Sequence, residues 1–460
     1  MPPLPTDSPV LIRSLCLGAA LVLAAGCQED APVGTVPQPA LRPLPPDPVP
    51  SWLDANVHPF DGTDLALPHT DLGFFRDIVG DARIVALGEG THGTRDFFEM
   101  KARILRFLVE EMGFNTFAIE ASWPESRRID RYVRTGVGDP EVLLSGLYFW
   151  TWNTESVLEM IEWMRDYNDA GGDVGFHGFD MQFPGMALHN VREYVGEVAP
   201  ELLEDISAQL GCLDNFANNP RGRSPRPSYR DQSDSHRAEC ALSLEGVRER
   251  LLAHRDEFVT AGGEDAFEVA LQSLRVAFQY HLVVVGEQGR DESMAENTEW
   301  LSRRIGPDGR MVLWAHNGHV ADRLGWQGSF LRETFGDDMV IVAFSHERGR
   351  LTARRELERF CGERTVFDLD DPISGSYERL LARAAAPRFV LDLRDVDADD
   401  PGGAWLAEMQ LFRSIGACYD PANPQWYWYE TPLTAEFDVL IHFESTGPTT
   451  VLPFRYPESW

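Results

Sequence analysis

Short apolar runs alternate with longer amphipathic stretches along most of the chain, beginning near residue 83. Residues 84–87 and 116–119 form almost continuous apolar runs, a pattern typical of strands buried on both faces of a parallel sheet. Between them, residues 94–112 repeat large apolar side chains at the spacing of one helical face, which predicts an amphipathic helix. The order strand, helix, strand predicts a βαβ unit with two parallel strands and a right-handed crossover.

Later apolar runs predict five further strands, at residues 174–176, 311–314, 339–344, 389–391 and 437–443. Between about residues 186 and 306 the strand pattern disappears and helical periodicity continues, apart from a polar stretch at 218–235 that predicts a surface loop. We therefore predict an α/β fold with a mostly parallel central sheet flanked by helices. Residues 51–185 and 307–460 would form this catalytic core, and residues 186–306 an inserted all-helical subdomain.

The first fifty residues predict an export signal and a tether. The apolar run at residues 15–25 follows Arg13 and is shorter than the ~20 residues that a membrane-spanning helix needs. Residues 23–27, LAAGC, resemble a bacterial lipobox, in which the cysteine is lipidated after cleavage. We expect a lipoprotein signal peptide at 1–26, lipidation of Cys27 and a Pro-rich tether at 27–50. The protein would then lie in the cell envelope and touch the membrane only through its lipid anchor.

Composition narrows the classes of function. The 460 residues are 43% hydrophobic and 11% aromatic, which is enough for a sizeable core and argues against a disordered chain. Lys and Arg number 41 and Asp and Glu 73, so the formal net charge is −32. Nucleic acid is not an expected partner, because phosphate binding relies on clustered cations. No protein partner is predicted.

The cysteines beyond residue 50 form an even set in a chain that is expected to be exported. They are Cys212, Cys240, Cys361 and Cys418. Oxidising compartments favour disulfides, and four cysteines allow three pairings. Their order along the sequence suggests Cys212–Cys240 and Cys361–Cys418.

Reactive side chains gather where the predicted strands end. These residues are Glu89, His92, Glu120, His177, Asp180, His316, His319 and His346. Ligands of open parallel sheets bind beyond the carboxyl ends of the strands. The sequence therefore predicts a functional site at this edge, although any one of these histidines could instead be structural.

Residues 88–93 read G-x-G-x-x-G within the predicted βαβ unit, which is the outline of a dinucleotide-binding fingerprint. The carboxylate of Glu89 would lie beside the pyrophosphate and oppose the attraction of the helix N-terminus. An exported lipoprotein also has little access to nicotinamide cofactors. We predict no cofactor.

The same segment resembles the erythromycin esterase family. The resemblance rests on residues 87–95, 98–101, 107–114, 118–121, 177–180, 290–297, 316–319 and 437–443, and extends over about residues 55–455. It implies a hydrolase like those that open macrolide lactones with water and without a metal. The motif histidine, regarded as the general base in that family, is His92 here. By the same resemblance Glu89 is its neighbour, Glu120 lies opposite, and His316 and His319 form the far wall.

These residue types are also suited to ester hydrolysis on chemical grounds, independently of the family resemblance. An imidazole titrates near neutral pH and can deprotonate water, and a carboxylate from Glu89 or Glu120 could fix its tautomer. A protonated His316 or His319, or Arg290, could stabilise the tetrahedral oxyanion. No G-x-S-x-G motif occurs, so a serine acyl-enzyme is not expected. The predicted partner is a small-molecule ester or lactone.

Supporting roles are predicted for Lys101, His177, Asp180 and Arg290. Lys101 is the only lysine of the chain and lies on the apolar face of its helix, where a buried ammonium needs a partner. We expect Glu89 or Glu120 to be that partner and to be held under His92; alternatively, the lysine stem packs on apolar surface and the amine reaches solvent. Arg290 could instead form only a salt bridge with Asp291.

Two alternatives use the same residues. Glu89, His92, Glu120 and the later histidines are ligand types for zinc or iron, which allows a metal-dependent hydrolase or a metal- or haem-binding lipoprotein. No H-E-x-x-H motif occurs, and Glu89 and His92 straddle a loop, so no metal ligands are assigned. Four aromatic residues after strand ends could form an apolar substrate wall or plain core: Trp123, Phe149, Trp150 and Trp152.

Overall fold

A computed structural model describes residues 47–216, 228–357 and 360–456. The predicted signal peptide at 1–26, Cys27 and most of the tether at 27–50 lie outside the described residues. The folded unit spans Asp47–Trp460, and its first helix, α1 (Val49–Asn56), begins inside the range that the sequence assigns to the tether. Within the described ranges, no helix combines the length and hydrophobicity that a bilayer span requires.

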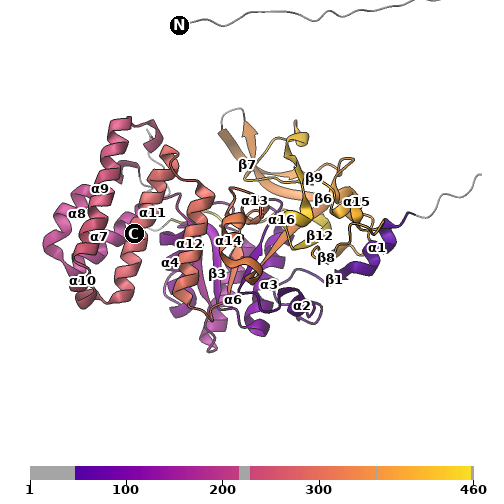
Figure 1. The fold of residues 1–460 in the computed structure, drawn as a ribbon, viewed down its shortest axis with the longest axis horizontal. Helices are drawn as coiled ribbons and strands as arrows, with labels where there is room; N and C mark the ends of the chain where they lie inside the picture. Colours follow the sequence, from indigo (N-terminus) through magenta and orange to yellow (C-terminus); the bar gives the residue numbers. More distant parts are fainter. Residues whose placement is uncertain (1–46, 217–227, 358–359, 457–460) are drawn as a thin grey trace, which may run out of the picture. The chain divides into compact units, whose positions relative to one another are not determined.

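A mixed sheet forms the centre of the fold and confirms the predicted class (Figure 1). Six neighbouring strands are parallel: β12 (Val439–Thr446), β6 (Met339–Leu357), β2 (Ile84–Leu87), β5 (Met311–Trp314), β3 (Thr116–Ser122) and β4 (Gly175–Asp180). Two further strands continue the sheet beyond β12: β8 (Arg388–Asp392), which is antiparallel to β12, and then β1 (Val57–Pro59), which is antiparallel to β8.

The predicted βαβ unit is present, but its two strands are not neighbours. Helix α3 (Arg95–Met112) connects β2 to β3, and β5 lies between these two strands. Leu313 of β5 is in register with Ala86 of β2 on one side and with Ala118 of β3 on the other. The hydrophobic pattern predicts the order of elements along the chain. It does not predict that a strand from further along the chain, β5, lies between β2 and β3 in the sheet.

Both faces of the sheet are buried. Val85 and Leu87 of β2 pack into a core shared with α3, whereas Ile84 and Ala86 belong to the core on the opposite face. This explains why the strand reads as a continuous apolar run. The remaining helices of the α/β part are α2 (Phe75–Val79), α4 (Trp123–Thr135), α5 (Pro140–Ser145), α6 (Glu155–Asp169), α13 (Asn317–Val320), α14 (Gln327–Phe335), α15 (Tyr377–Leu381) and α16 (Leu433–Glu436).

The predicted helical insertion corresponds to a run of six α-helices. They are α7 (Gly185–Val198), α8 (Leu203–Leu210), α9 (Asp234–Ala253), α10 (Arg255–Gly262), α11 (Glu264–Val285) and α12 (Arg290–Ile305). The described residues from 185 to 305 contain no strand. Helix α12 packs against β4 and therefore brings its N-terminal residues Arg290 and Asp291 to the edge of the sheet.

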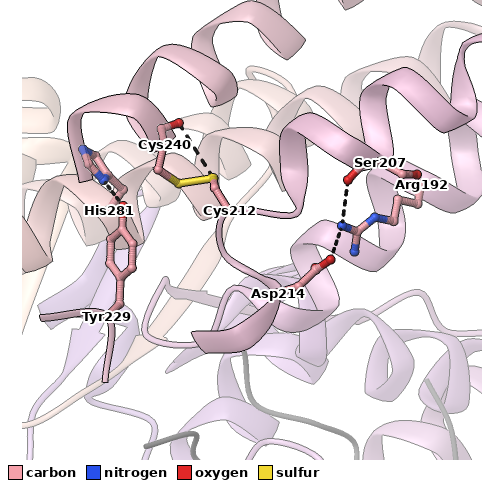
Figure 2. The surroundings of a disulfide bond; sticks show 7 residues. All are labelled: Arg192, Ser207, Cys212, Asp214, Tyr229, Cys240 and His281. Carbon is pink, nitrogen blue, oxygen red and sulfur yellow. Dashed lines mark hydrogen bonds and ion pairs between the residues drawn. A yellow bond between two sulfur atoms is a disulfide. The ribbon is translucent and has the colours of Figure 1, made fainter. Parts of the chain in front are cut away.

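Both suggested disulfide pairings are present. Cys212–Cys240 joins the segment after α8 to α9 inside the helical insertion, as Figure 2 shows. Cys361–Cys418 joins β7 (Phe360–Asp368) to β10 (Cys418–Tyr419), and both of these strands pair with the second half of β6. A separate pair, β9 (Gln410–Arg413) and β11 (Trp428–Thr431), lies nearby in the sequence.

Candidate active site

The loop that follows β2 is held in very close contact with neighbouring backbone, and its glycines make this contact possible. A Cβ atom added to Gly88 would lie 2.2 Å from Oδ1 of Asn317, and one added to Gly93 would lie 1.6 Å from the carbonyl oxygen of Thr352. The carbonyl of Gly93 also accepts the N–H of Thr352 at 2.9 Å. The glycine pattern is therefore explained by close packing of the loop against β6 and α13, with no need for a bound phosphate.

Glu89 is the centre of a buried hydrogen-bond array. Its Oε1 lies 2.7 Å from Nδ1 of His92, and its Oε2 accepts from Nζ of Lys101 at 2.5 Å and from Nε1 of Trp314 at 2.8 Å. The Glu89 side chain is fully buried, whereas 12% of the His92 side chain is exposed. Because a carboxylate only accepts hydrogen bonds, Nδ1 of His92 carries a proton, and the neutral form of the ring has its lone pair at Nε2.

Lys101 lies beneath this array with no exposure to solvent. Its ammonium lies 4.5 Å from the centre of the Trp314 ring and also donates to the carbonyl of Ala315 at 3.3 Å. Burial disfavours the charged amine and lowers the pKa of Lys101 to about 8, although the charge of Glu89 acts in the opposite direction. The structure therefore pairs the single lysine with Glu89, one of the two carboxylates expected from the sequence.

A second polar cluster surrounds Glu120 at the end of β3. Its Oε1 accepts from Nη2 of Arg290 at 2.7 Å, and its Oε2 accepts the backbone N–H of His316 at 3.1 Å. The same Arg290 nitrogen donates to Oδ2 of Asp180 at 2.6 Å, so one guanidinium joins the ends of β3 and β4. Burial opposes ionisation of Glu120, but His319 and Arg290 outweigh it and hold its pKa well below the usual range.

His319 is the second cation of this cluster. Its Nδ1 lies 2.7 Å from Oδ1 of Asp291, and its Nε2 lies 3.3 Å from Oε1 of Glu120. Burial disfavours the imidazolium, but the charge of Glu120 and the hydrogen bonds to Asp291 and Glu120 raise the pKa of His319 to about 10. Nη1 of Arg290 lies 3.1 Å from the same Nε2, a close approach of two cations that the surrounding carboxylates offset.

His316 connects the two clusters and has the opposite protonation state. Its ring centre lies 4.9 Å from that of His92, and its backbone N–H is held by Glu120. Burial, together with the nearby His92 and His319, lowers the pKa of His316 well below the usual range. Nδ1 accepts the N–H of Gly318 at 3.2 Å and caps α13, so the neutral ring carries its proton on Nε2.

A cavity of about 470 Å³ opens beside His316. Its remaining wall comes from the C-terminal part of the chain, and apolar side chains dominate it: Ala321, Trp326, Phe412, Ala417, Tyr427, Tyr429 and Phe437. Charged groups at the wall are Glu356 and the ion pair Arg323–Glu436, whose atoms Nε and Oε1 are 2.7 Å apart. This cavity has the apolar lining and few polar groups of a small-molecule site.

Two of the histidines at strand ends lie outside this array. His177 lies near Asp130 and Arg134 of α4, and burial lowers its pKa; the structure does not bring it to the cluster around Glu120. His346 is buried with its ring 5.2 Å from that of Phe97, between α3 and the sheet. Successive residues of a strand face opposite sides of a sheet, so position near a strand end does not by itself direct a side chain into the site.

The four aromatic residues considered for a substrate wall do not line the cavity. Trp123 packs against Trp300 at a ring distance of 5.1 Å, and Phe149 packs against Phe183 at 5.0 Å. Trp152 does reach the site, where its Nε1 donates to the carbonyl of Glu120 at 2.8 Å and its ring lies 5.7 Å from that of His92. Trp152 therefore supports the site by packing against His92 and by holding the backbone of Glu120.

The donor atoms suited to a metal already have partners. Glu89 accepts from Lys101 and Trp314, Glu120 accepts from Arg290, and both ring nitrogens of His319 face carboxylates. Within the described part of the chain, no group of three or more His, Cys, Asp and Glu side chains is arranged to hold a metal ion. This geometry gives the metal- and haem-binding alternatives no support.

Sequence reasoning missed Trp314 and the cavity wall. Trp314 ends a predicted strand two residues before His316, and an indole N–H in a buried strand needs an acceptor, which is a signal that could have identified it. Apart from Phe437, which begins one segment of the family resemblance, the wall residues after 410 show no motif, since they are brought to His316 only by the fold.

Comparison with known sequences agrees with the family resemblance of the sequence. The family model described as "Erythromycin esterase" matches residues 109–446. The type II erythromycin esterase of Escherichia coli is 24% identical over 376 residues, which cover 74% of this chain and 86% of that protein. The family match begins after Glu89, His92 and Lys101, so the roles of these three residues are argued from their geometry.

Solved structures share the fold. A protein from Bacillus cereus superposes with a TM-score of 0.78 and 24% identity, and the similarity covers 89% of this chain and 100% of that one. A mutant of the erythromycin esterase EreC, in its open conformation, gives a TM-score of 0.63 at 18% identity, over 83% of this chain and 95% of that one. At these identities the likeness concerns the fold.

Proposed function

This chain belongs to the erythromycin esterase family of hydrolases, and we propose that it cleaves a carboxylic ester or lactone with water activated by His92. The observation that carries the proposal is the contact of Glu89 with both His92 and Lys101, with the ring of His92 4.9 Å from that of His316, which lines the cavity. Glu89 fixes the tautomer of His92 and leaves the Nε2 lone pair as the base. It also stabilises the imidazolium that forms when a proton is taken from water.

The proposed reaction proceeds through a tetrahedral intermediate. The water oxygen bonds to the acyl carbon while Nε2 of His92 takes its proton; the bond from the acyl carbon to the alcohol oxygen then breaks, and the same proton passes to the leaving alkoxide. Nε2–H of the neutral His316, next to His92, is suited to donate to the developing oxyanion. Acid and alcohol are the products, or one hydroxy acid from a lactone.

The cluster around Glu120 is proposed to act by positioning. Glu120 holds the backbone of His316, and Arg290, Asp180 and His319 hold Glu120. The protonated His319 and Arg290 neutralise much of the charge of three carboxylates, so the site does not repel an oxyanion as strongly as its acidic residues alone would. His316 lines the cavity, so one side of the ester would extend into it.

The substrate class proposed is a neutral or cationic ester or lactone with one bulky apolar group. The apolar cavity supports this size, and a macrolactone is the candidate suggested by a relative named as an erythromycin esterase. Loss of His92 is expected to lower kcat by about 10³-fold, a typical contribution of general-base catalysis. The experiment compares wild type with His92→Asn on p-nitrophenyl acetate, simple lactones and erythromycin.

Hydrolysis in H₂¹⁸O identifies the bond that breaks. With p-nitrophenyl acetate, attack of water on the acyl carbon places one ¹⁸O in the acetate and none in the p-nitrophenol, which mass spectrometry of the two products detects. His177→Asn is the matched control, because this strand-end histidine lies outside the array, and kcat should stay within about two-fold. Equal activity of wild type and His92→Asn would overturn the proposal.

We also propose that the chain is exported and carries a lipid on Cys27, as the LAAGC segment suggests. The mature protein would then be held at the cell envelope by the Pro-rich tether. Mass spectrometry of the N-terminal peptide should show a diacylglycerol on Cys27, and Cys27→Ser should release the protein from membranes. An unmodified Cys27 in the membrane-free fraction would contradict this localisation.

A further inference from the structure

The second half of β6 forms a small extension beyond the central sheet. Residues 350–357 pair antiparallel with β7, and residues 354 and 355 pair in parallel with the two residues of β10. Figure 1 shows β7 projecting from the sheet at this point. A separate apolar cluster stabilises the extension: Leu351, Ala353, Phe367, Ile415, Tyr419 and Tyr427.

The segment that leads into β10 is a wall of the cavity. Ser414, Gly416, Ala417 and Cys418 all line it. Between them, Ile415 donates its N–H to the carbonyl of Gly90 at 2.8 Å and so contacts the loop that carries Glu89 and His92. The segment at 414–418 therefore contacts both the substrate cavity and the loop that carries the proposed base.

Backbone hydrogen bonds hold the first part of this wall, where the N–H of Ser414 donates to the carbonyl of Tyr427 at 2.9 Å, and the pairing becomes short at β10. Strand β10 has only two residues in register with β6, and the N–H of Arg354 donates to the carbonyl of Ala417 at 3.0 Å. The covalent constraint is the disulfide from Cys418 to Cys361 on β7. Because the bond starts at a residue that itself lines the cavity, it limits the movement of the wall directly.

We propose that the Cys361–Cys418 disulfide is a positioning element that sets the specificity of the site by holding this wall. The inference rests on the proposed hydrolase function and adds a determinant of which esters bind. An ester with a bulky apolar group needs the wall in place to bury that group. A small ester occupies mainly the space near His92 and His316, so its turnover depends less on the wall.

The chain provides a matched control for the test. Cys212–Cys240 also joins two segments close in sequence, but it lies in the helical insertion and does not line the cavity (Figure 2). The measured quantity is the ratio of kcat/KM for a bulky ester, p-nitrophenyl cyclohexanecarboxylate, to that for p-nitrophenyl acetate. Cys361→Ser/Cys418→Ser should lower this ratio by about ten-fold, mainly through KM of the bulky ester. Cys212→Ser/Cys240→Ser should leave it within about two-fold.

Reduction of the folded protein tests the same claim if the double variant does not fold. In the Cys212→Ser/Cys240→Ser background, tris(2-carboxyethyl)phosphine converts the remaining disulfide to two thiols and is oxidised to the phosphine oxide. The ratio should fall on reduction while circular dichroism stays unchanged. An unchanged ratio, or equal falls in both disulfide variants, would overturn the inference.

A binding measurement separates this inference from the proposed function. The neutral dye Nile red should bind the oxidised protein, and its Kd should rise by about ten-fold when Cys361–Cys418 is removed and not when Cys212–Cys240 is removed. If no ester is hydrolysed while the dye responds in this way, the hydrolase proposal fails and the role of the wall stands. Failure of the dye to bind, or the same Kd in all variants, would contradict the proposed role of the Cys361–Cys418 disulfide in holding the wall.

Discussion

Glu89 joins the only lysine of the chain to the proposed base, so the buried ion pair and the chemistry share one carboxylate. The sequence predicts a partner for Lys101 because the residue lies on an apolar helical face, where an unpaired ammonium is costly. The sequence does not show whether Glu89 or Glu120 is this partner, since the two residues come at the ends of the two predicted strands on either side of the helix that carries Lys101. The choice depends on β5, whose insertion in the sheet brings Trp314 and Ala315 to Lys101.

Replacing Lys101 by methionine is expected to lower kcat/KM by about 10²-fold, because Glu89 would lose the cation that orients it under His92. The change should also cost about 3–5 kcal/mol of unfolding free energy, as expected when one partner of a buried ion pair is removed. Arg103→Met is the matched control, since Arg103 is a second buried cation on α3, paired with Asp71 at 2.5 Å and away from the site. Steady-state kinetics and urea unfolding should show similar losses of stability but a loss of activity only in Lys101→Met.

The pH dependence of activity follows from the lowered pKa of Lys101. Below its pKa of about 8 the amine is charged and holds Glu89; as the pH rises through that value the charge is lost. We therefore expect kcat/KM to fall on the alkaline side near pH 8, after subtraction of hydroxide-catalysed hydrolysis. The charges of Glu89 and Glu120 act on this amine, and His92 shares Glu89 with it, so the observed value belongs to the coupled group.

Lys101→Arg tests the assignment of this alkaline limb. A guanidinium stays charged through this pH range, so the variant should lose the limb even though its planar fork lowers the absolute rate. The measurement is kcat/KM from about pH 6 to about pH 10, with wild type beside the variant. The same alkaline limb in both proteins would show that another group is responsible.

At the scale of elements, the strongly periodic segments were predictable and the weakly periodic ones were not. The helix expected at 94–112 is α3, and each predicted strand of the central sheet is present. The second half of β6 was missed because residues 347–357 are mostly charged, and only Leu351 and its neighbours are buried there. Such a strand gains its stability from pairing with β7 and β10, which the local pattern does not record.

The loop after β2 allows a prediction about close packing. In Gly93→Ala the added methyl would collide with the backbone of Thr352, so β6 or the loop must shift, at a cost of about 1–3 kcal/mol or more. The shift should also lower kcat/KM, since the same loop carries Glu89 and His92. Gly113→Ala is the control: Gly113 ends α3 at a φ of 74°, with open space around it, and should cost about 1 kcal/mol by backbone strain alone.

Chemical unfolding and ester turnover measure these two effects separately. Gly113→Ala should lower stability and leave kcat/KM within about two-fold. A Gly93→Ala protein with wild-type stability and wild-type turnover would show that the close contact is not required. The G-x-G-x-x-G pattern would then need another explanation than packing against β6.

At the scale of the whole molecule, the site combines parts of the chain that are far apart in sequence. Arg290 and Asp291 come from the helical insertion, Glu89 and His92 from the first half, and the cavity wall from residues after 315. The position of reactive residues at strand ends predicts Glu89 and His92 because it depends on local order, whereas Arg290 and Asp291 begin a helix and were suggested by the family resemblance. The wall depends on how the C-terminal segments return to β5 and β6, and the sequence carries no short-range signal for that return.

Net charge predicts how charged esters reach this site. The chain has a formal charge of −32, and the charged side chains at the cavity are Glu356, Glu436 and Arg323. The negative electrostatic potential of such a protein attracts cationic substrates and repels anionic ones. Salt weakens this effect, because at 0.1 M ionic strength the interaction between charges decays over a Debye length of about 10 Å. We therefore expect kcat/KM to rank cationic above neutral above anionic p-nitrophenyl esters of similar size at low salt.

Salt should remove most of this ranking. Between about 20 mM and about 500 mM sodium chloride, the ratio of kcat/KM for a trimethylammonium ester to that for a hemisuccinate ester should fall by about ten-fold, whereas p-nitrophenyl acetate should change little. Glu356→Gln separates the local charge from the global one: it removes one carboxylate at the wall and should reduce the ratio at low salt only in part. A ratio that does not respond to salt would show that discrimination comes from contacts inside the cavity, because screened long-range attraction has to weaken as ions are added.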